Sequence, residues 1–286
     1  MIKKLLILAL IISTTACTKA QKPVEPPSTP QTSVSIIPDH APGEIPFDFP
    51  PVELTSTPTG SYVLSPSLAE LQNAWNYKEN TVFTFEPAIL QKTVETVSTL
   101  KDLQGKIFEM PNSLIIPLTD SQAQKSDILI TWWQGGSGLA HAIVNNSTDE
   151  STPDVYYFDE FVSTPATLKA KTFKILSNRF QQGSPIAIKN GNEYQSGIII
   201  NINKEKALVK GFNNTISVQN IKNVIPINLH PSVEINSTVY APIYGIFTKV
   251  TVTAIDEEKG QIKASYSENG KTNEHIFFFS EIITKL

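Results

Sequence analysis

The chain has 286 residues, of which 40% are apolar, and its net charge at neutral pH is −4. This apolar content is sufficient for one or several hydrophobic cores. Arg179 is the only arginine, and arginine is the residue that best reads phosphates and base edges. A mildly acidic chain without a basic face is therefore not expected to bind nucleic acid.

The first sixteen residues have the composition of a secretory signal. Lys3 and Lys4 precede an apolar run from residue 5 to residue 12, and small residues fill positions 13–16. Eight apolar residues are too few to span a bilayer as a helix. We therefore expect residues 1–16 to be a leader that is removed.

Cys17 follows this leader directly and is the only cysteine, so no intramolecular disulfide can form. The sequence Thr14-Thr15-Ala16-Cys17 resembles a bacterial lipoprotein signal, although that family usually has leucine where Thr14 stands. The resemblance implies cleavage before Cys17, acylation with palmitate-like chains, and a membrane anchor. By the family's sorting pattern, Thr18 indicates the outer membrane. The alternative is an ordinary secretory leader with a cysteine nearby by chance.

Residues 17–60 are predicted to form the lipid anchor and a disordered linker. Ten of the twenty prolines lie between positions 18 and 60, among Thr, Ser, Gln and Glu. Such a composition buries too little apolar surface to offset the entropy of ordering. A chain of roughly 40 residues in this state reaches on the order of 100 Å.

Residues 61–118 are predicted to form a small helical subdomain. Pro66 suits a first helical position, and Leu68, Leu71 and Trp75 follow at helical spacing. A second helix is predicted over residues 87–105, because its apolar residues fall on one helical face and Gly105 suits a C-terminal cap.

The remaining chain contains three segments with the same order of short strands. They span residues 127–176, 184–227 and 237–286. Each has an apolar strand, a turn, and then the strands AHAIV and DVYYFDE, QSGIII and KALVKGF, or KVTVTAI and QIKASYS. The closing strands are TFKIL, IKNVIPI and EIITKL. Short, bent strands at this density predict small antiparallel barrels.

This arrangement resembles Tudor and agenet-type domains, in which the third strand often reads like the VYYFDEF found here. The resemblance implies a mainly β protein with three tandem Tudor-like barrels over residues 119–180, 181–231 and 232–286. An unrelated antiparallel sandwich is the alternative fold. Tudor-like barrels use aromatic side chains at strand ends to bind cations or other partners.

Carried over to this chain, the resemblance implies an aromatic binding cluster: Trp132, Trp133, Tyr156, Phe158, Asp159, Tyr240, Tyr244 and Tyr266. Alternation predicts that Trp132 and Trp133 point to opposite faces, and that Tyr156 and Phe158 share a face opposite Tyr157. The second unit has few aromatic residues and is expected to act as a spacer.

Signals for catalysis are weak in this sequence. Leu139 replaces the final glycine that a G-x-S-x-G motif would need after Ser137, and the four histidines lack metal-ligand spacing. No phosphate loop or dinucleotide fingerprint is present, so no cofactor or metal is expected. The sequence favours a non-catalytic binding or scaffolding lipoprotein whose partner is an envelope protein or cell-wall component. A glycan-binding lipoprotein and an envelope hydrolase are the alternatives.

Overall fold

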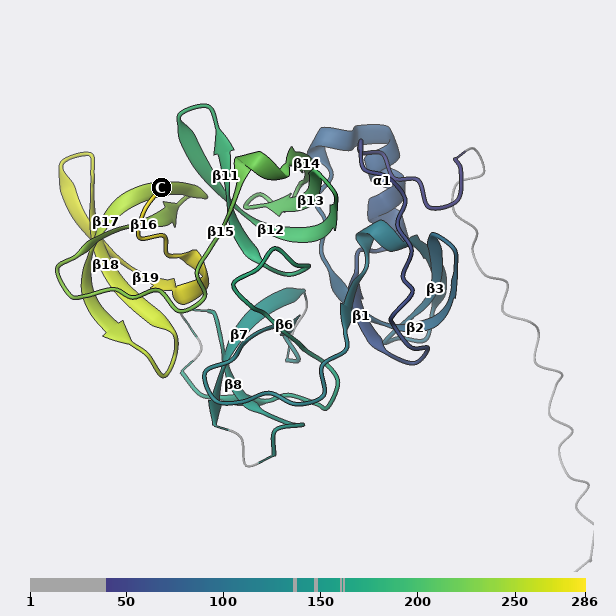
Figure 1. The fold of residues 1–286 in the computed structure, drawn as a ribbon, viewed down its shortest axis with the longest axis horizontal. Coiled ribbons are helices and arrows are strands. Elements are labelled where there is room, and N and C mark those ends of the chain that lie inside the picture. The colour runs from purple at the N-terminus through teal and green to yellow at the C-terminus, as the bar shows by residue number, and fades with distance from the viewer. Residues whose placement is uncertain (1–39, 136–137, 147–148, 160, 162) are drawn as a thin grey trace, which may run out of the picture. The chain divides into compact units, whose positions relative to one another are not determined.

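The computed structural model describes residues 40–286 except 136–137, 147–148, 160 and 162. This part of the chain is mainly β and contains antiparallel sheets, as predicted (Figure 1). No sheet closes into a barrel through the strand pairing of the described residues. The predicted leader and Cys17 lie outside the described residues.

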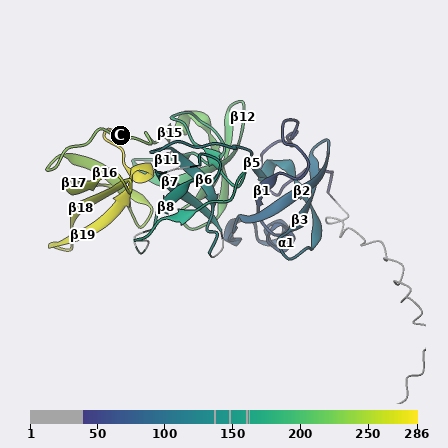
Figure 2. The same cartoon turned by 90° about the horizontal axis from the view of Figure 1, so that it is seen from below.

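The first sheet is built from residues that the sequence analysis assigned to a helical subdomain. Its order is β4-β3-β2-β1-β5. The strands are β1 (Tyr62–Ser65), β2 (Glu86–Val94), β3 (Val97–Asp102), β4 (Ile107–Pro111) and β5 (Ile116–Leu118), with a short 3₁₀ helix at Asn112–Leu114 before β5. Only one α-helix is present in the described residues: α1 (Leu68–Tyr77), which lies between β1 and β2 and continues into a 3₁₀ turn at Lys78–Asn80. Figures 1 and 2 both show α1 beside these strands.

The prediction of a second helix over residues 87–105 was wrong, because β2 and β3 form a hairpin there. Ala88 and Leu90 are buried on one strand, and Ser98 and Leu100 on the other, which is the two-residue period of strands. The register of β2 against β3 shifts after Leu90, so the apolar spacing imitates a helical one. The helix expected from Pro66 onward is α1, which Ser67 caps by accepting a hydrogen bond from the Glu70 amide.

The second sheet has the order β10-β6-β7-β8-β9. Its strands are β6 (Ile128–Trp132), β7 (Leu139–Asn146), β8 (Asp154–Tyr157), β9 (Ala166–Thr167) and β10 (Lys174–Ile175).

The third sheet contains nine strands in two halves. The first half comprises β11 (Pro185–Asn190), β12 (Glu193–Asn203), β13 (Lys206–Gly211), β14 (Ile216–Asn220), a 3₁₀ helix at Ile221–Asn223 and β15 (Val224–Pro226). The second comprises β16 (Thr238–Ile243), β17 (Ile246–Asp256), β18 (Gln261–Glu268), β19 (Lys271–Phe278) and a 3₁₀ helix at Phe279–Glu281. A single residue pair, Gln195 with Ile246, joins β12 to β17.

Residues 62–283 thus contain four units with one strand order, not three. In each unit the closing strand pairs with the first strand, which pairs with the second, and so on to the fourth; in the last unit a bridge between Tyr240 and Ile283 makes the closing pair. The second strand of every unit shifts register against the third, after Leu90, Val144, Ile199 and Val252. A bulge bends its strand, so the second strand of all four units bends at the same place.

The four units share one core. A single hydrophobic cluster contains Leu64, Trp132, Leu208 and Val252, which come from the four units in turn. Asn201 Nδ2 also donates a hydrogen bond to the Ser113 carbonyl at 3.2 Å, linking β12 to the first unit. The units are therefore packed against one another within the described residues.

Part of the segment predicted to be a disordered linker is packed on this core. Ile45, Phe47 and Phe49 are buried, and the ring of Phe47 meets that of Phe83 edge-on at 5.9 Å. Asp48, between them, forms a salt bridge of 2.7 Å with Lys206 of β13. The chain bends at residues 46–48, where Pro46 is buried between Ile45 and Phe47, so a proline-rich composition did not prevent packing here.

Candidate functional site

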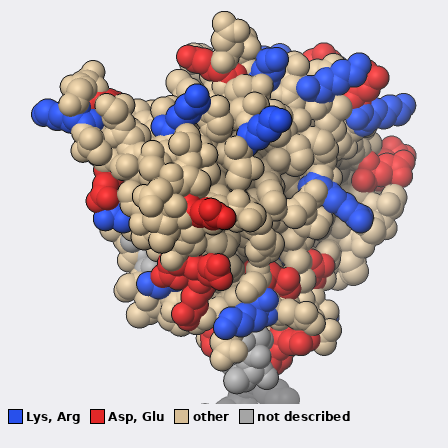
Figure 3. All heavy atoms as spheres, turned by 60° about the vertical axis from the view of Figure 1, so that its left-hand side comes forward, with Lys and Arg blue, Asp and Glu red and all other residues tan. Residues whose placement is uncertain are grey.

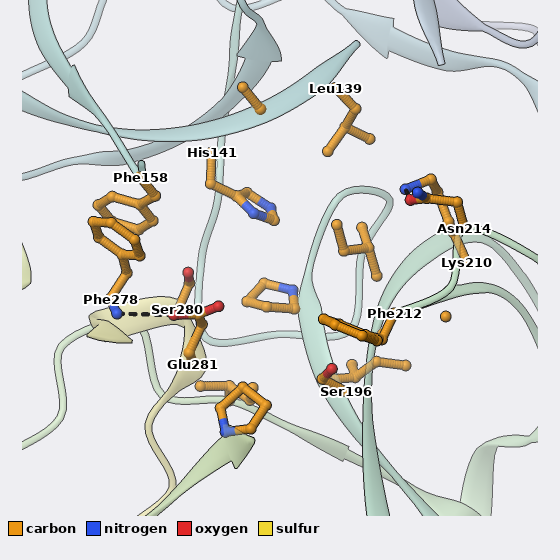
Figure 4. Close-up of a pocket in the computed structure, with 18 of the residues that line it drawn as sticks. Leu139, His141, Phe158, Ser196, Lys210, Phe212, Asn214, Phe278, Ser280 and Glu281 are labelled. Atoms are coloured by element: carbon orange, nitrogen blue, oxygen red, sulfur yellow. Dashed lines mark hydrogen bonds between the residues drawn. The ribbon is translucent and has the colours of Figure 1, made fainter. Parts of the chain in front are cut away.

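The last three units surround one cavity of about 350 Å³ (Figure 4). The second unit contributes Leu139, His141 and Phe158, and the third contributes Ser196, Lys210 and Phe212. The fourth contributes side chains from β17, from the end of β19 and from the 3₁₀ helix that follows, namely Phe247, Phe278, Ser280 and Glu281. None of these units could form this cavity alone, because each supplies one wall.

Aromatic rings form much of the wall. Trp133 is stacked on Tyr157 with ring centroids 5.2 Å apart and planes within 2°. The Tyr157 hydroxyl donates a hydrogen bond to the Trp132 carbonyl at 3.2 Å, and this bond holds the Tyr157 ring in place in the stack. Phe158 and Phe278 are stacked at 4.9 Å and join the second unit to the fourth.

His141 projects from β7 into the cavity (Figure 4). Its Nε2 lies 2.8 Å from the Gly183 carbonyl oxygen, so Nε2 carries the proton and Nδ1 is left as the acceptor. Burial lowers the pKa of His141, with a smaller opposing effect from the Gly183 carbonyl. The ring is therefore neutral at physiological pH.

Gly183 can serve this role only as glycine. Its φ is +91°, and a Cβ there would lie 2.7 Å from Cδ1 of Ile130. The carbonyl that holds His141 thus comes from a position where both the backbone angle and the space exclude a side chain.

Two further ionisable side chains in the cavity are shifted toward their neutral forms. Burial raises the pKa of Glu281 to about 7, although one of its oxygens accepts a hydrogen bond from the Phe278 amide at 3.0 Å. Burial also lowers the pKa of Lys210, whose Nζ donates to the side chain of Asn214. Glu281 can therefore gain or lose a proton near pH 7.

The surface outside carries no large field of one sign on the face that Figure 3 shows. Lysine and arginine side chains are interspersed with aspartate and glutamate there.

The candidate site residues predicted in residues 119–180, which form the second unit of the structure, are divided between this cavity and the core. Trp133, Phe158 and Asp159 line the cavity, whereas Trp132 is buried at 5% exposure against Tyr62. The opposite orientation of the two tryptophans is therefore confirmed.

The facing predicted for VYYFDEF is confirmed. Tyr156 and Phe158 both pack on the large shared core, whereas Tyr157 belongs to a separate cluster with Leu129 and Phe173. The Phe158 amide donates to the His141 carbonyl at 2.9 Å, so the alternation continues one residue past the end of β8. Tyr157 and Phe158 both line the cavity.

The fourth unit contributes other residues than those predicted. Tyr240, Tyr244 and Tyr266 do not line this cavity. Tyr240 packs in a small cluster with Phe247, and Tyr244 is 73% exposed at the turn between β16 and β17. The sequence signal that was missed is the charged Glu281 within an apolar run, FFFSEII.

The sequence analysis expected the second Tudor-like segment, which is the third unit of the structure, to act as a spacer, and its role in binding stays a prediction. Lys210 and Phe212, at the end of β13 and just after it, form one wall of the cavity. Phe212 is one of the few aromatic residues of this segment, whereas Lys210 did not stand out in the sequence, because its contribution depends on the position of the neighbouring units.

Comparisons with known proteins identify no relatives: no protein-family model matches the chain, and no curated protein is similar to it in sequence. Within residues 40–286 as described, no helix has the length and hydrophobicity needed to cross a bilayer. The same residues contain no cluster of three or more His, Cys, Asp or Glu side chains arranged to hold a metal ion. Function must therefore be argued from the geometry of the cavity.

Proposed function

We propose that this protein is a lipid-anchored binding protein of the bacterial cell envelope, in which Tudor-like units build a non-catalytic binding site. The observation that carries the proposal is the aromatic-lined cavity shared by three units. A cavity of this kind, with a few convergent polar groups, is the usual form of a ligand site. The common strand order and bulge of the four units support the Tudor-like part of the proposal.

The ligand suited to this cavity is an envelope protein side chain or a small organic group with an apolar body. Trp133, Tyr157 and Phe212 offer ring surface, and Glu281 and His141 offer one proton donor or acceptor each near pH 7. Binding that favours ionised Glu281 releases a proton, and binding that favours the acid form takes one up.

The anchor is proposed from the sequence alone. Replacing Cys17→Ser removes the only thiol that could be acylated, so the variant should accumulate as precursor or leave the membrane fraction. Fractionation of cells that express either form measures this. Equal partitioning of both forms into detergent would refute the lipoprotein assignment.

The binding site is tested by Trp133→Ala, with Phe161→Ala as the matched control. Phe161 follows the cavity residue Asp159 by two positions, is 86% exposed and does not line the cavity. Full mature chains are immobilised and exposed to detergent-solubilised envelopes. A partner retained by wild type and the control but lost in Trp133→Ala supports the proposal, and retention by all three places the site elsewhere.

A hydrolase is separated from a binder by Ser137→Ala. The substitution should abolish hydrolysis by any enzyme that uses this serine, and it should leave retention of a partner unchanged if the protein only binds. Loss of a measurable hydrolytic activity in this variant would overturn the non-catalytic assignment.

A further inference from the structure

A second groove, distinct from the cavity, lies where the two halves of the nine-stranded sheet meet. It has a volume of about 430 Å³, and its floor lies beside the Gln195–Ile246 pair that joins β12 to β17. The Ser196 amide donates to the Gly245 carbonyl at 2.8 Å beside this pair. Among the described residues, no lysine, arginine, histidine, aspartate or glutamate lines the groove. A charged ligand would therefore find no counter-ion here.

One side of the groove is a row of neutral polar side chains on the edge strand β14. Ile216 is buried and Val218 packs on the core, so the alternate residues Ser217 and Gln219 face the groove. Residues at this spacing lie about 7 Å apart along a strand. The row therefore presents hydroxyl and amide groups at regular intervals.

These polar groups are held in place and keep hydrogen-bonding capacity. Gln219 Nε2 donates to Ser217 Oγ at 3.0 Å, which leaves the Gln219 carbonyl oxygen as an acceptor. Asn213 Oδ1 accepts from Thr215 Oγ1 at 2.7 Å, which leaves the two Asn213 amide protons as donors. The side chain of Gln195 makes no hydrogen bond with the described residues and provides both kinds of group.

The other side of the groove carries two exposed rings, Phe212 at 64% and Tyr244 at 73%. They come from different units and are brought near each other by Gly245, where a Cβ would lie 2.6 Å from the Cβ of Phe212. Tyr244 has a φ of 50°, a left-handed angle that is unfavourable for a tyrosine. Tyr244 and Gly245 are the two loop residues of the β16–β17 hairpin, a tight turn that requires positive φ at both positions, and this turn holds the ring in solvent beside the groove.

We propose that this groove binds a neutral oligosaccharide. Sugar hydroxyls need many directional donors and acceptors, and the apolar faces of pyranose rings pack on aromatic rings. The absence of ionisable side chains from the lining excludes sulfated or strongly acidic glycans as the preferred ligand. The proposal goes beyond the cavity and does not depend on it, although Ser196 and Phe212 border both.

The test measures binding of three probes to the full mature chain by calorimetry: a tetrasaccharide of N-acetylglucosamine, a tetrasaccharide of glucose, and a sulfated tetrasaccharide. At least one neutral probe should bind, and Tyr244→Ala should weaken it tenfold or more. Tyr77→Ala is the matched control, because Tyr77 is 67% exposed on α1 in a different unit. Its affinity should equal that of wild type.

A second variant, Gln219→Ala, covers the case in which Tyr244→Ala fails to fold. It removes one amide from an edge strand and should weaken the neutral probe severalfold. Trp133 lines the cavity and not the groove, so Trp133→Ala should leave sugar binding unchanged. The proposals for the cavity and for the groove can therefore fail independently of each other. Tighter binding of the sulfated probe, no binding of either neutral probe, or unchanged binding in both groove variants would overturn the proposal.

Discussion

The substitution Glu281→Gln tests whether burial of the ionised Glu281 carboxylate destabilises the folded protein. The pKa of Glu281 is about 7 in the folded protein against 4.5 for an ordinary glutamate. Between these values the unfolded chain releases its proton while the folded chain keeps it. The contribution of Glu281 to the free energy of unfolding is therefore fully present below pH 4.5. It falls as the pH rises toward 7 and stays constant above pH 7.

The size of the effect follows from the pKa difference. At 1.36 kcal/mol for each unit, the shift of Glu281 from 4.5 to about 7 corresponds to roughly 3 kcal/mol of lost stability at pH 8 and above. Glutamine has the shape of the protonated acid and can still accept the hydrogen bond from the Phe278 amide. The variant should therefore match wild type near pH 4.5 and exceed its free energy of unfolding by up to roughly 3 kcal/mol at pH 8.5.

Urea unfolding at several pH values measures this difference directly. Midpoints of variant and wild type are compared at each pH where the slopes agree, so that titration of other groups cancels. The control is Glu258→Gln, which makes the same change of charge at an exposed position outside the cavity. A stability difference between Glu281→Gln and wild type that is the same at every pH would refute the reasoning.

Three further substitutions test how the units are held together. Trp132→Ala removes a buried ring from the shared core and should lower the free energy of unfolding by ~3–5 kcal/mol, as measured by urea unfolding. Phe47→Ala should lower the free energy of unfolding by a similar ~3–5 kcal/mol and make residues 43–49 more sensitive to limited proteolysis than in wild type. If these residues were an unpacked linker, wild type and variant would be cleaved equally. Gly183→Ala should cost more than ~1 kcal/mol and disturb the His141 ring, visible as a shifted imidazole resonance, because of its positive φ and the contact with Ile130.

The sequence was most informative where strand patterns are local. The closing strands of the second and third units were predicted, because alternation and turn residues are properties of neighbouring positions. In the fourth unit the predicted strand EIITKL forms only the bridge between Ile283 and Tyr240. The first unit was missed for a local reason as well. The bulge after Leu90 and the turn at Glu95, with a φ of 50°, broke the alternation of a hairpin that contains several β-branched residues.

The linker shows a signal that was present and overlooked. Ile45, Phe47 and Phe49 stand at every second position, which is the pattern of an extended chain packed on one side. Pro46 and the prolines on either side of this stretch were interpreted as a sign of disorder. Proline fixes φ in an extended range and does not prevent burial of its neighbours.

The cavity could not have been predicted from these patterns. Trp133 and Phe158 were selected as aromatic residues at strand ends, and they do line it. Lys210 and Glu281 were not, because they become functional candidates only when units distant in sequence meet. Periodicity determines which side of its own strand a residue faces, but it does not show which unit lies opposite.

The closing strand of each unit has a consequence for synthesis. β5, β10 and β15 each return to the first strand of their own unit, so the strand pairing within each of these units is complete within about 40 to 60 residues. A chain emerging from its N-terminus can thus finish one unit before the next has appeared, with little loop entropy to overcome at each step. Neighbouring units of equal strand order could exchange closing strands, and early closure limits the time in which such an exchange can occur.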